Sequence, residues 1–332
     1  FCVTLLPEYL VPDGEQQAQL PGWMQQALAH GMLDSVVTPA SPLPIAAGEA
    51  IGFLGDAMVP TASAQGERRY FVHLEVLSTD SGLPAFLHNP MQVTLGEKYI
   101  RLRAGGTLYS RLERNGRSEF LPSSAINEHD GKIVHVTAGG TFTDAQQQTF
   151  YQISTLGWLR QQDVELLNQY DLAARGFTVL EQDASPDVMQ SLQEEWMVGA
   201  FRQISSQVGS HNGFEERRLA AAYQHLAEAC ATGALPHRTT NSKRYSALHH
   251  PEKGVRQIAA RLVVKHDSEW FGGSSHPRWE TRFKCYDPLL IGYSRQWLDN
   301  HEWMSQVDAF KEGPPIWHMH PVMFLGELGL GN

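Results

Sequence analysis

The chain has 332 residues, 42% hydrophobic and 19% charged, a globular composition long enough for two or three hydrophobic cores. Its formal net charge of −10 argues against nucleic acid as a partner, because nucleic-acid-binding proteins present a basic face. Cys2, Cys230 and Cys285 form no CxxC pair and predict neither a metal knuckle nor a disulfide framework. No apolar run approaches the length of a transmembrane helix, which argues against membrane insertion. The chain begins at Phe1 without Met, which is typical of a piece of a longer protein.

Residues 1–90 are expected to be mostly β structure, with one helix near residues 22–30. The segment 70–77 alternates as a strand does and places His73 and Glu75 on one face. A His followed by a carboxylate two positions later is compatible with a zinc site. Catalytic zinc needs three protein ligands, however, and no companions precede His73 in the sequence.

Residues 91–170 carry several short strand patterns separated by turn dipeptides. Strands are expected at 99–102, 107–109, 132–136 and 149–153, with Gly-Gly, Asn-Gly and Asp-Gly pairs between them. This spacing predicts a small barrel of SH3 type. The alternative is an irregular β meander.

From about residue 171 the strand signals fade and helical periodicity takes over. Helices are expected at 186–208, 214–232, 252–266 and 296–306. The chain is therefore predicted to be an α+β protein with a β-rich N-terminal half and an all-helical domain at 171–332. The change of pattern also predicts that residues 171–332 fold alone.

The segment Lys265-His266-Asp267-Ser268-Glu269-Trp270 carries the strongest catalytic signal. Apolar residues with helical spacing precede it, so Glu269 is expected at a helix C-terminus beside Trp270. The helix dipole and the aromatic surface both disfavour a carboxylate, so Glu269 should hold its proton as a glycosidase acid does. The alternative is an exposed Glu beside a core Trp.

Two further carboxylates, Glu280 and Asp287, follow a loop-forming segment. Glycoside hydrolysis usually requires a second carboxylate across the scissile bond, and either residue could fold back to supply it. The alternative for each is a solvated loop residue. Trp270 and Trp279 are candidates for packing on sugar rings.

The segment Trp317-His318-Met319-His320-Pro321 places two His on one face of an extended strand. Such a pair permits metal binding, yet no third ligand is indicated nearby, and the segment could equally be a structural lock. We therefore predict no metal and no cofactor, and treat Trp317 and His320 as candidate substrate-binding residues.

The motif Ala47-Gly48-Glu49-Ala50-Ile51-Gly52, followed by Val72-His73-Leu74-Glu75-Val76, resembles the second half of a lysostaphin-like zinc peptidase domain. That family carries His-x-His-x-Glu, and Phe71 replaces the first His here. The resemblance therefore implies an incomplete or inactive peptidase region at 1–90.

The later motifs resemble the C-terminal region of bacterial type VI secretion effectors that degrade peptidoglycan. The motifs at 157–165, 175–180, 264–270 and 317–321 carry this resemblance. It implies a lysozyme-like domain at 171–332, a wall-binding SH3-like domain at 91–170, and action in the periplasm of target bacteria. It also implies an immunity protein and a carrier in the secretion apparatus as partners.

The sequence thus predicts a muramidase that cuts peptidoglycan glycan strands, with Glu269 as general acid. Two alternatives remain open. One is a zinc amidase or endopeptidase built on His73, which would cut peptide stems. The other is a wall-binding module without catalytic activity.

Overall fold

The computed structural model describes the chain over the following residues: 20–31, 35–39, 41–46, 48–52, 54–60, 66–71, 73–114, 116–155, 157–181, 188–209, 214–231, 247–248, 253–268, 270–284, 288–313 and 315–329. Glu269 and Asp287 therefore lie outside the described residues. The described part is a mixed α+β structure, with a β-rich first half and helices in the C-terminal part. This coarse prediction is confirmed.

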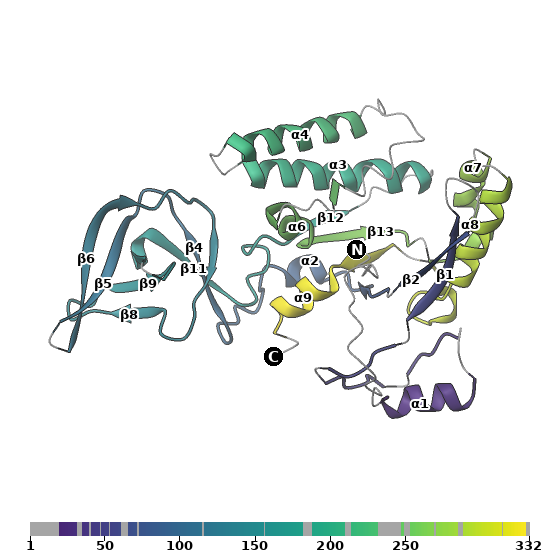
Figure 1. Ribbon diagram of the computed structural model, residues 1–332, viewed down its shortest axis with the longest axis horizontal. Helices are drawn as coiled ribbons and strands as arrows, with labels where there is room; N and C mark the ends of the chain where they lie inside the picture. The colour runs from purple at the N-terminus through teal and green to yellow at the C-terminus, as the bar shows by residue number, and fades with distance from the viewer. Residues whose placement is uncertain are drawn as a thin grey trace.

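Residues 98–168, called the β unit below, form two antiparallel sheets at one end of the molecule (Figure 1). The five-stranded sheet has the order β6-β5-β10-β9-β8 and the three-stranded sheet the order β11-β4-β7. The strands are β4 (Lys98–Leu102), β5 (Thr107–Arg114), β6 (Arg117–Ile126), β7 (Ile133–His135), β8 (Thr141–Thr143), β9 (Thr149–Gln152), β10 (Trp158–Arg160) and β11 (Val164–Asn168), with the 3-10 turn η2 (Gln161–Asp163) between the last two.

Each of the four strands expected in the β unit is present, because turn dipeptides and apolar alternation are local signals. Ile100 and Leu159 are fully buried in its main core, and Phe150 and Trp158 anchor a second aromatic core. The unit thus has its own hydrophobic interior. Its likeness to an SH3 barrel stays a prediction.

A four-stranded mixed sheet forms the centre of the rest of the molecule. Its order is β12-β13-β14-β3, where β12 and β13 run parallel and the other neighbours antiparallel. The strands are β12 (Thr178–Glu181), β13 (Leu262–His266), β14 (Ile316–Met319) and β3 (Val76–Ser78). We call this sheet and the helices on it the sheet unit.

Helices cover both faces of this sheet, as Figure 1 shows. On one face, α3 (Val188–Gly209), α4 (Phe214–Ala231) and α6 (Lys253–Ala259) pack against Leu262 and Val264 of β13. On the other face, α2 (Leu83–Phe86) and α9 (Pro321–Glu327) pack against Val263 and Trp317. Alternate residues of β13 thus enter different cores, as strand geometry requires.

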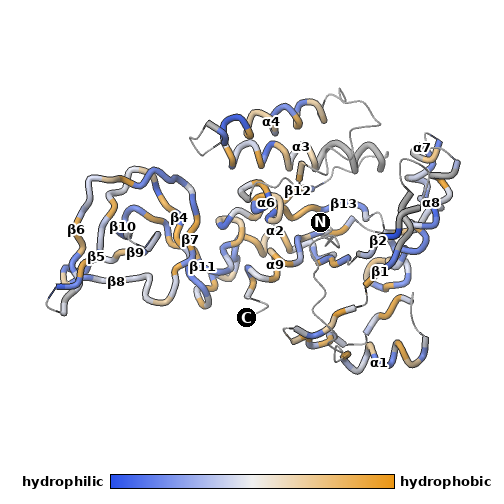
Figure 2. The backbone as a smooth tube through the Cα atoms, viewed as in Figure 1, coloured by the Kyte–Doolittle hydropathy of each residue, from blue (hydrophilic) through white to orange (hydrophobic). Residues whose placement is uncertain are grey.

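The prediction of an all-helical C-terminal domain is wrong, because β12, β13 and β14 lie within it. The expected helix through residues 252–266 ends at Ala259, and Leu262–His266 forms β13 instead. A strand buried on both faces is a continuous apolar run, which a short helical stripe can imitate. Figure 2 shows β13 passing from hydrophobic to hydrophilic residues along its length. Lys265 and His266 are strand residues, so the helix-end argument for Glu269 does not hold.

The remaining elements lie at the far end of the sheet unit. They include the hairpin β1 (Gly55–Pro60) and β2 (Gly66–Phe71), the predicted helix α1 (Gly22–Ala29), and α8 (Pro288–Asn300), which begins eight residues before the helix expected at 296–306. The short turns are η3 (Gly273–Ser275), η4 (Pro277–Trp279), α7 (Glu280–Phe283) and η5 (Met304–Gln306). Among the described residues no helix is long and apolar enough to cross a bilayer.

The β unit is an insertion between two parts of the sheet unit. The Ala173 amide donates to the Leu87 carbonyl at 2.8 Å, and Asn89 donates to Asp171 at 2.7 Å, so the two connections lie side by side. Leu87 is fully buried in the core beneath α9, although it precedes the β unit in sequence. Residues 76–87 therefore complete the C-terminal unit rather than belong to a separate region at 1–90.

This connectivity changes the expectation that residues 171–332 fold alone. That fragment lacks β3 and the buried Leu83 and Leu87, and removing one buried Leu side chain costs about 2–5 kcal/mol. We expect the fragment to show no cooperative thermal unfolding by circular dichroism. A chain in which a short Gly-Ser linker replaces residues 91–170 should keep it. Equal unfolding transitions in the two proteins would contradict the insertion.

Candidate functional site

Three segments that the sequence singled out meet beside strands β14 and β3 of the central sheet. Leu77 of β3 lies opposite His318 of β14, and Trp317 lies opposite Lys265 of β13. Leu77, Ile316 and Trp270 share one core with the α8 residue Trp297. Side-chain contacts of Trp270 therefore bring the residues after β13 to β3 and to the residues that precede it.

A His–carboxylate pair lies at the centre of this meeting point. The Nε2 atom of His73 donates to Oε1 of Glu75 at 3.1 Å, and the Trp270 indole Nε1 donates to the same oxygen at 3.2 Å. The His73 and Trp270 rings meet edge to face, with their centroids 5.0 Å apart. Glu75 Oε2 is buried without a hydrogen-bond partner among the described residues. The side chain of Glu75 is 10% exposed and that of His73 24%, so only the imidazole reaches solvent appreciably.

The environment of Glu75 keeps it ionised. Burial alone would raise the pKa of this carboxyl, but the hydrogen bond and charge of His73, with the hydrogen bond from Trp270, lower the pKa overall. A carboxylate only accepts hydrogen bonds, so His73 carries a proton on Nε2 and its basic nitrogen in the neutral ring is Nδ1. A carboxylate that fixes the tautomer of a partly exposed imidazole is suited to general-base chemistry.

His301 and Trp297 border this pair on the α8 side. The His301 ring lies 5.7 Å from Trp270 and 3.9 Å from Trp297, measured between centroids. Burial lowers the pKa of His301, and the charge of His73 lowers it further against the raising effect of its hydrogen bond to the Trp297 carbonyl. His301 is therefore neutral near pH 7.

The turn after Trp270 is held by two carboxylates of the α8 segment. Asp299 accepts from the Ser274 amide at 2.8 Å, and Glu302 accepts from the Gly272 amide at 3.4 Å. Gly273 has φ +54°, and a Cβ there would lie 2.8 Å from Asp299 Oδ1. Glycine is therefore required at Gly273. The two carboxylates hold the backbone of the turn that follows Trp270 in a fixed position.

A second pair of imidazoles lies in the sheet itself. The rings of His266 in β13 and His318 in β14 stack with centroids 3.9 Å apart and planes 10° from parallel. Burial and the neighbouring charge of His266 hold the pKa of His318 well below its usual 6.5. His318 is 3% exposed, and its Nε2 has no hydrogen-bond partner among the described residues. It is therefore neutral in the folded protein near pH 7.

His318 should make the folded state sensitive to acid. Folding depresses the pKa of His318. Below about pH 6.5 the imidazole is therefore protonated in the unfolded chain but stays neutral in the folded chain, until the pH reaches the lower pKa of the folded state. Stability is thus fully present above pH 6.5 and falls as pH drops, by at most about 1.4 kcal/mol per pH unit for this one group. Urea unfolding between pH 7 and 5 should show a shallower decline in His318→Gln than in the wild type. Identical slopes in the two proteins would rule out this role.

The carboxylates predicted for catalysis are not brought together by the described residues. Glu269 and Asp287 lie outside the described part, although Ser268 and Trp270, which flank Glu269 in sequence, are buried at 3% and 8% exposure. Glu280 is exposed in the first turn of α7. The carboxylate that the structure does place on Trp270 is Glu75, which sequence spacing did not connect to it because the two residues are 195 positions apart.

The aromatic candidates for sugar binding are core residues. Trp317 is 1% exposed and packs beneath α9, with Lys265 over its ring, while Trp279 is 8% exposed and packs with Phe283. Rings so covered cannot stack on a sugar. His320 caps α9 by accepting from the Met323 amide, and it follows β14 instead of sharing a strand face with His318. The reading of Trp317-His318-Met319-His320-Pro321 as a structural lock agrees with this geometry.

The described residues do not form a zinc site. No group of three His, Cys, Asp or Glu side chains within the described ranges is arranged to hold a metal ion. The nearest approach to such chemistry is the His73–Glu75 pair, where the carboxylate occupies one ring nitrogen directly. Comparison with protein-family models, with curated proteins and with solved structures finds no match to this chain.

Proposed function

We propose that the chain is a peptidoglycan hydrolase of muramidase type, with its active site at the His73–Glu75–Trp270 cluster. The observation that supports this most is the buried carboxylate–imidazole pair, which accepts a hydrogen bond from Trp270, the residue after Glu269 in sequence. A buried carboxylate with a perturbed pKa beside a partly exposed imidazole is typical of hydrolytic sites.

The proposed mechanism divides acid and base roles between two segments. Glu269 protonates the leaving glycosidic oxygen, and the imidazole of His73 takes a proton from the attacking water. Glu75 holds the tautomer of His73 and stabilises the imidazolium that forms. The role that the sequence assigned to Glu280 or Asp287 passes in this mechanism to the His73–Glu75 pair.

The wider context of the proposal rests on the sequence resemblance alone. It is delivery by a type VI secretion system into the periplasm of target bacteria, with an immunity protein that blocks the site. The lysozyme-like description of residues 171–332 and the SH3-like description of residues 91–170 belong to the same proposal.

Product analysis of digested sacculi tests the function. Purified protein should release muropeptides with new reducing ends, detected by borohydride reduction and mass spectrometry. His73→Gln should release far fewer. A matched control is His135→Gln, which removes an exposed His–Glu pair of the β unit, with a 2.6 Å contact to Glu97. Absence of new reducing ends with wild-type protein would overturn the proposal.

One observation favours amide hydrolysis as a second candidate. Metal-ligating imidazoles are commonly oriented by a carboxylate on their other nitrogen, which is how Glu75 holds His73. A peptidase or amidase would release new amino groups rather than reducing ends, and EDTA would abolish the activity. The described residues do not complete the ligand set, so no step of the mechanism above uses a metal.

A further inference from the structure

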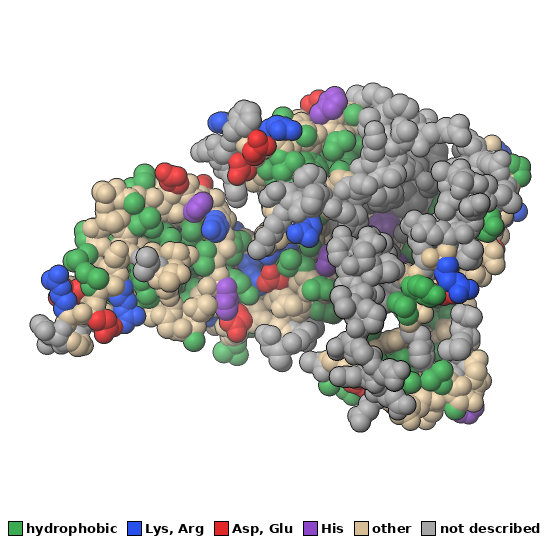
Figure 3. All heavy atoms as spheres, viewed as in Figure 1, with side chains coloured by type: hydrophobic (Ala, Val, Ile, Leu, Met, Phe, Trp, Pro, Cys, Tyr) green, Lys and Arg blue, Asp and Glu red, His purple; other side chains and the backbone are tan. Residues whose placement is uncertain are grey.

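A groove of about 1300 Å³ separates the β unit from the helical layer of the sheet unit. In Figure 3 basic side chains lie in the recess between these two parts. One wall is the loop 129–133 of the β unit, and the other is formed by β12, α3, α4 and α6. The volume exceeds the roughly 300–1000 Å³ typical of small-molecule pockets, so the groove has room for part of a polymer. We call it the interdomain groove.

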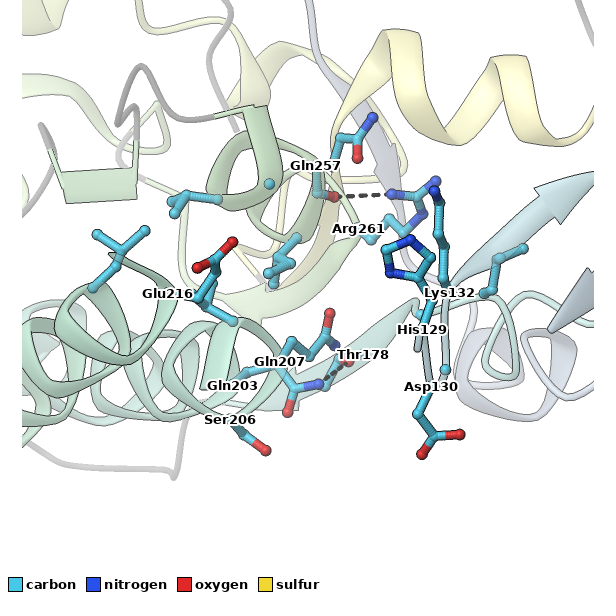
Figure 4. A pocket seen from close by; sticks show the side chains of 18 of the residues that line it. His129, Asp130, Lys132, Thr178, Gln203, Ser206, Gln207, Glu216, Gln257 and Arg261 are labelled. Atoms are coloured by element: carbon cyan, nitrogen blue, oxygen red, sulfur yellow. Dashed lines mark hydrogen bonds between the residues drawn. The ribbon is translucent and has the colours of Figure 1, made fainter. Parts of the chain in front are cut away.

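Basic side chains from both units meet at one end of this groove. Figure 4 shows His129 and Lys132 of the β unit pointing toward Arg261, which follows α6. The backbone of Lys132 is fixed, because its carbonyl accepts from the Leu102 amide at 2.8 Å. Its side chain is exposed, and no ion pair of Lys132 occurs among the described residues. Like charges held together in this way favour an anion between them.

The carboxylates at this end do not neutralise it. Glu327 binds both Arg261, at 3.0 Å, and the buried Arg175, so two guanidinium groups share one negative charge. Asp130 points away from the basic end in Figure 4, and its carboxylate accepts from the Ala104 amide. The acidic residues Glu215 and Glu216 belong to α4, on the opposite wall.

The rest of the groove presents neutral hydrogen-bonding groups. Gln203 and Gln207 of α3 line it together with Thr178 of β12, and the Gln203 amide donates to the Thr178 hydroxyl at 3.1 Å. Carboxamides both donate and accept, so they match the peptide groups of an extended chain. The lining therefore combines an anion-attracting end with a polar, uncharged wall.

We propose that the interdomain groove binds a polar chain through its carboxylate, with the carboxylate between Lys132 and Arg261. This assignment rests on the proposed function: the chain that supplies the carboxylate is the stem peptide of peptidoglycan. The residues that line the groove do not include any member of the His73–Glu75–Trp270 cluster. The groove thus holds a part of the polymer other than the bond that is cut, which raises the local concentration of that bond.

Calorimetric titration of the full chain with a synthetic stem peptide tests this site without using activity. The peptide is compared with its C-terminally amidated form and with a muramic acid disaccharide, which carries its carboxylate on the sugar. Loss of one charge-assisted hydrogen bond should weaken binding about tenfold or more, so we expect this loss for the amidated peptide and for Lys132→Gln. In a double-mutant cycle the two losses should not add.

Lys284→Gln, at the exposed end of α7, is the matched control and should bind as the wild type does. Lys132-dependent binding of the disaccharide instead of the peptide would support the carboxylate site and assign it to the glycan. Equal affinity of Lys132→Gln and wild type for the acid peptide and the disaccharide would overturn the inference. If sacculi yield no reducing ends while peptide binding depends on Lys132, the proposed function is wrong and the carboxylate site in the interdomain groove is still supported.

Discussion

Glu269→Gln is expected to slow the release of reducing ends from sacculi by about two to four orders of magnitude, the usual contribution of a general acid. The amide keeps the size of the side chain but cannot donate the proton that the leaving oxygen needs. The far-ultraviolet circular dichroism and the melting temperature should remain those of the wild type. Cleavage at nearly the wild-type rate by a folded Glu269→Gln protein would exclude the assigned acid.

Two companion variants locate the rest of the machinery. Glu75→Gln leaves His73 without its carboxylate and should cost about two orders of magnitude or more in rate, since the imidazole loses both its fixed tautomer and its counter-charge. Glu280→Gln changes an exposed carboxylate of α7 and should leave the rate unchanged. The reverse result, an inactive Glu280 variant beside an active Glu75 variant, would restore the second carboxylate predicted from sequence.

The parts of the fold that the sequence predicted well are those specified by local signals. The strands of the β unit are separated by dipeptides such as Asp130-Gly131, where Gly131 adopts φ +72°, a conformation that glycine accepts without strain. Helix α4 was expected at 214–232 and is observed at Phe214–Ala231, because its apolar residues repeat at helical spacing over many turns.

The parts that could not be predicted depend on contacts between distant segments. The run Leu262–His266 becomes a strand because β12 and β14 flank it and helices cover both its faces. No local pattern shows that Val76–Ser78 pairs with β14, because the whole β unit lies between these two strands in sequence. In the sequence, the strands of such a sheet are only short apolar runs, and a short apolar run is compatible with either a strand or a helix.

The candidate site illustrates the same limit. The motifs around His73, Trp270 and His318 were each recognised, but they were assigned to three different purposes. Contacts between distant segments assemble them: Trp270 donates to Glu75, and the pairing of β13 with β14 stacks His266 on His318. The His301 side chain gave no signal in sequence, because a lone His in a helical segment is not distinguished from any surface residue.

One buried guanidinium lies at the contact between the two units. Arg175 is 3% exposed, its charge lies 3.6 Å from the centre of the Tyr99 ring, and it binds both the Gln169 carbonyl and Glu327. Burial lowers the pKa of this guanidinium, against the raising effects of Tyr99 and Asp171. A buried guanidinium is stable only where its partners compensate for its lost hydration. If the guanidinium is removed, each partner is left buried without its counterpart.

Arg175→Met is therefore expected to lower the free energy of unfolding by about 3–5 kcal/mol, as removal of one member of a buried ion pair does. Met keeps much of the aliphatic volume but leaves the Gln169 carbonyl without this donor and Glu327 with Arg261 alone. Arg111→Met is the matched control in the β unit. Its ion pair with Glu113 is partly exposed, and its guanidinium also lies 4.7 Å from the centre of the Phe142 ring and donates to Ser118, so its loss should cost about 1–2 kcal/mol. Urea denaturation of both variants, followed by tryptophan fluorescence, measures the difference. If Arg175→Met loses no more stability than Arg111→Met, the two units are held together by their apolar contacts and not by this guanidinium.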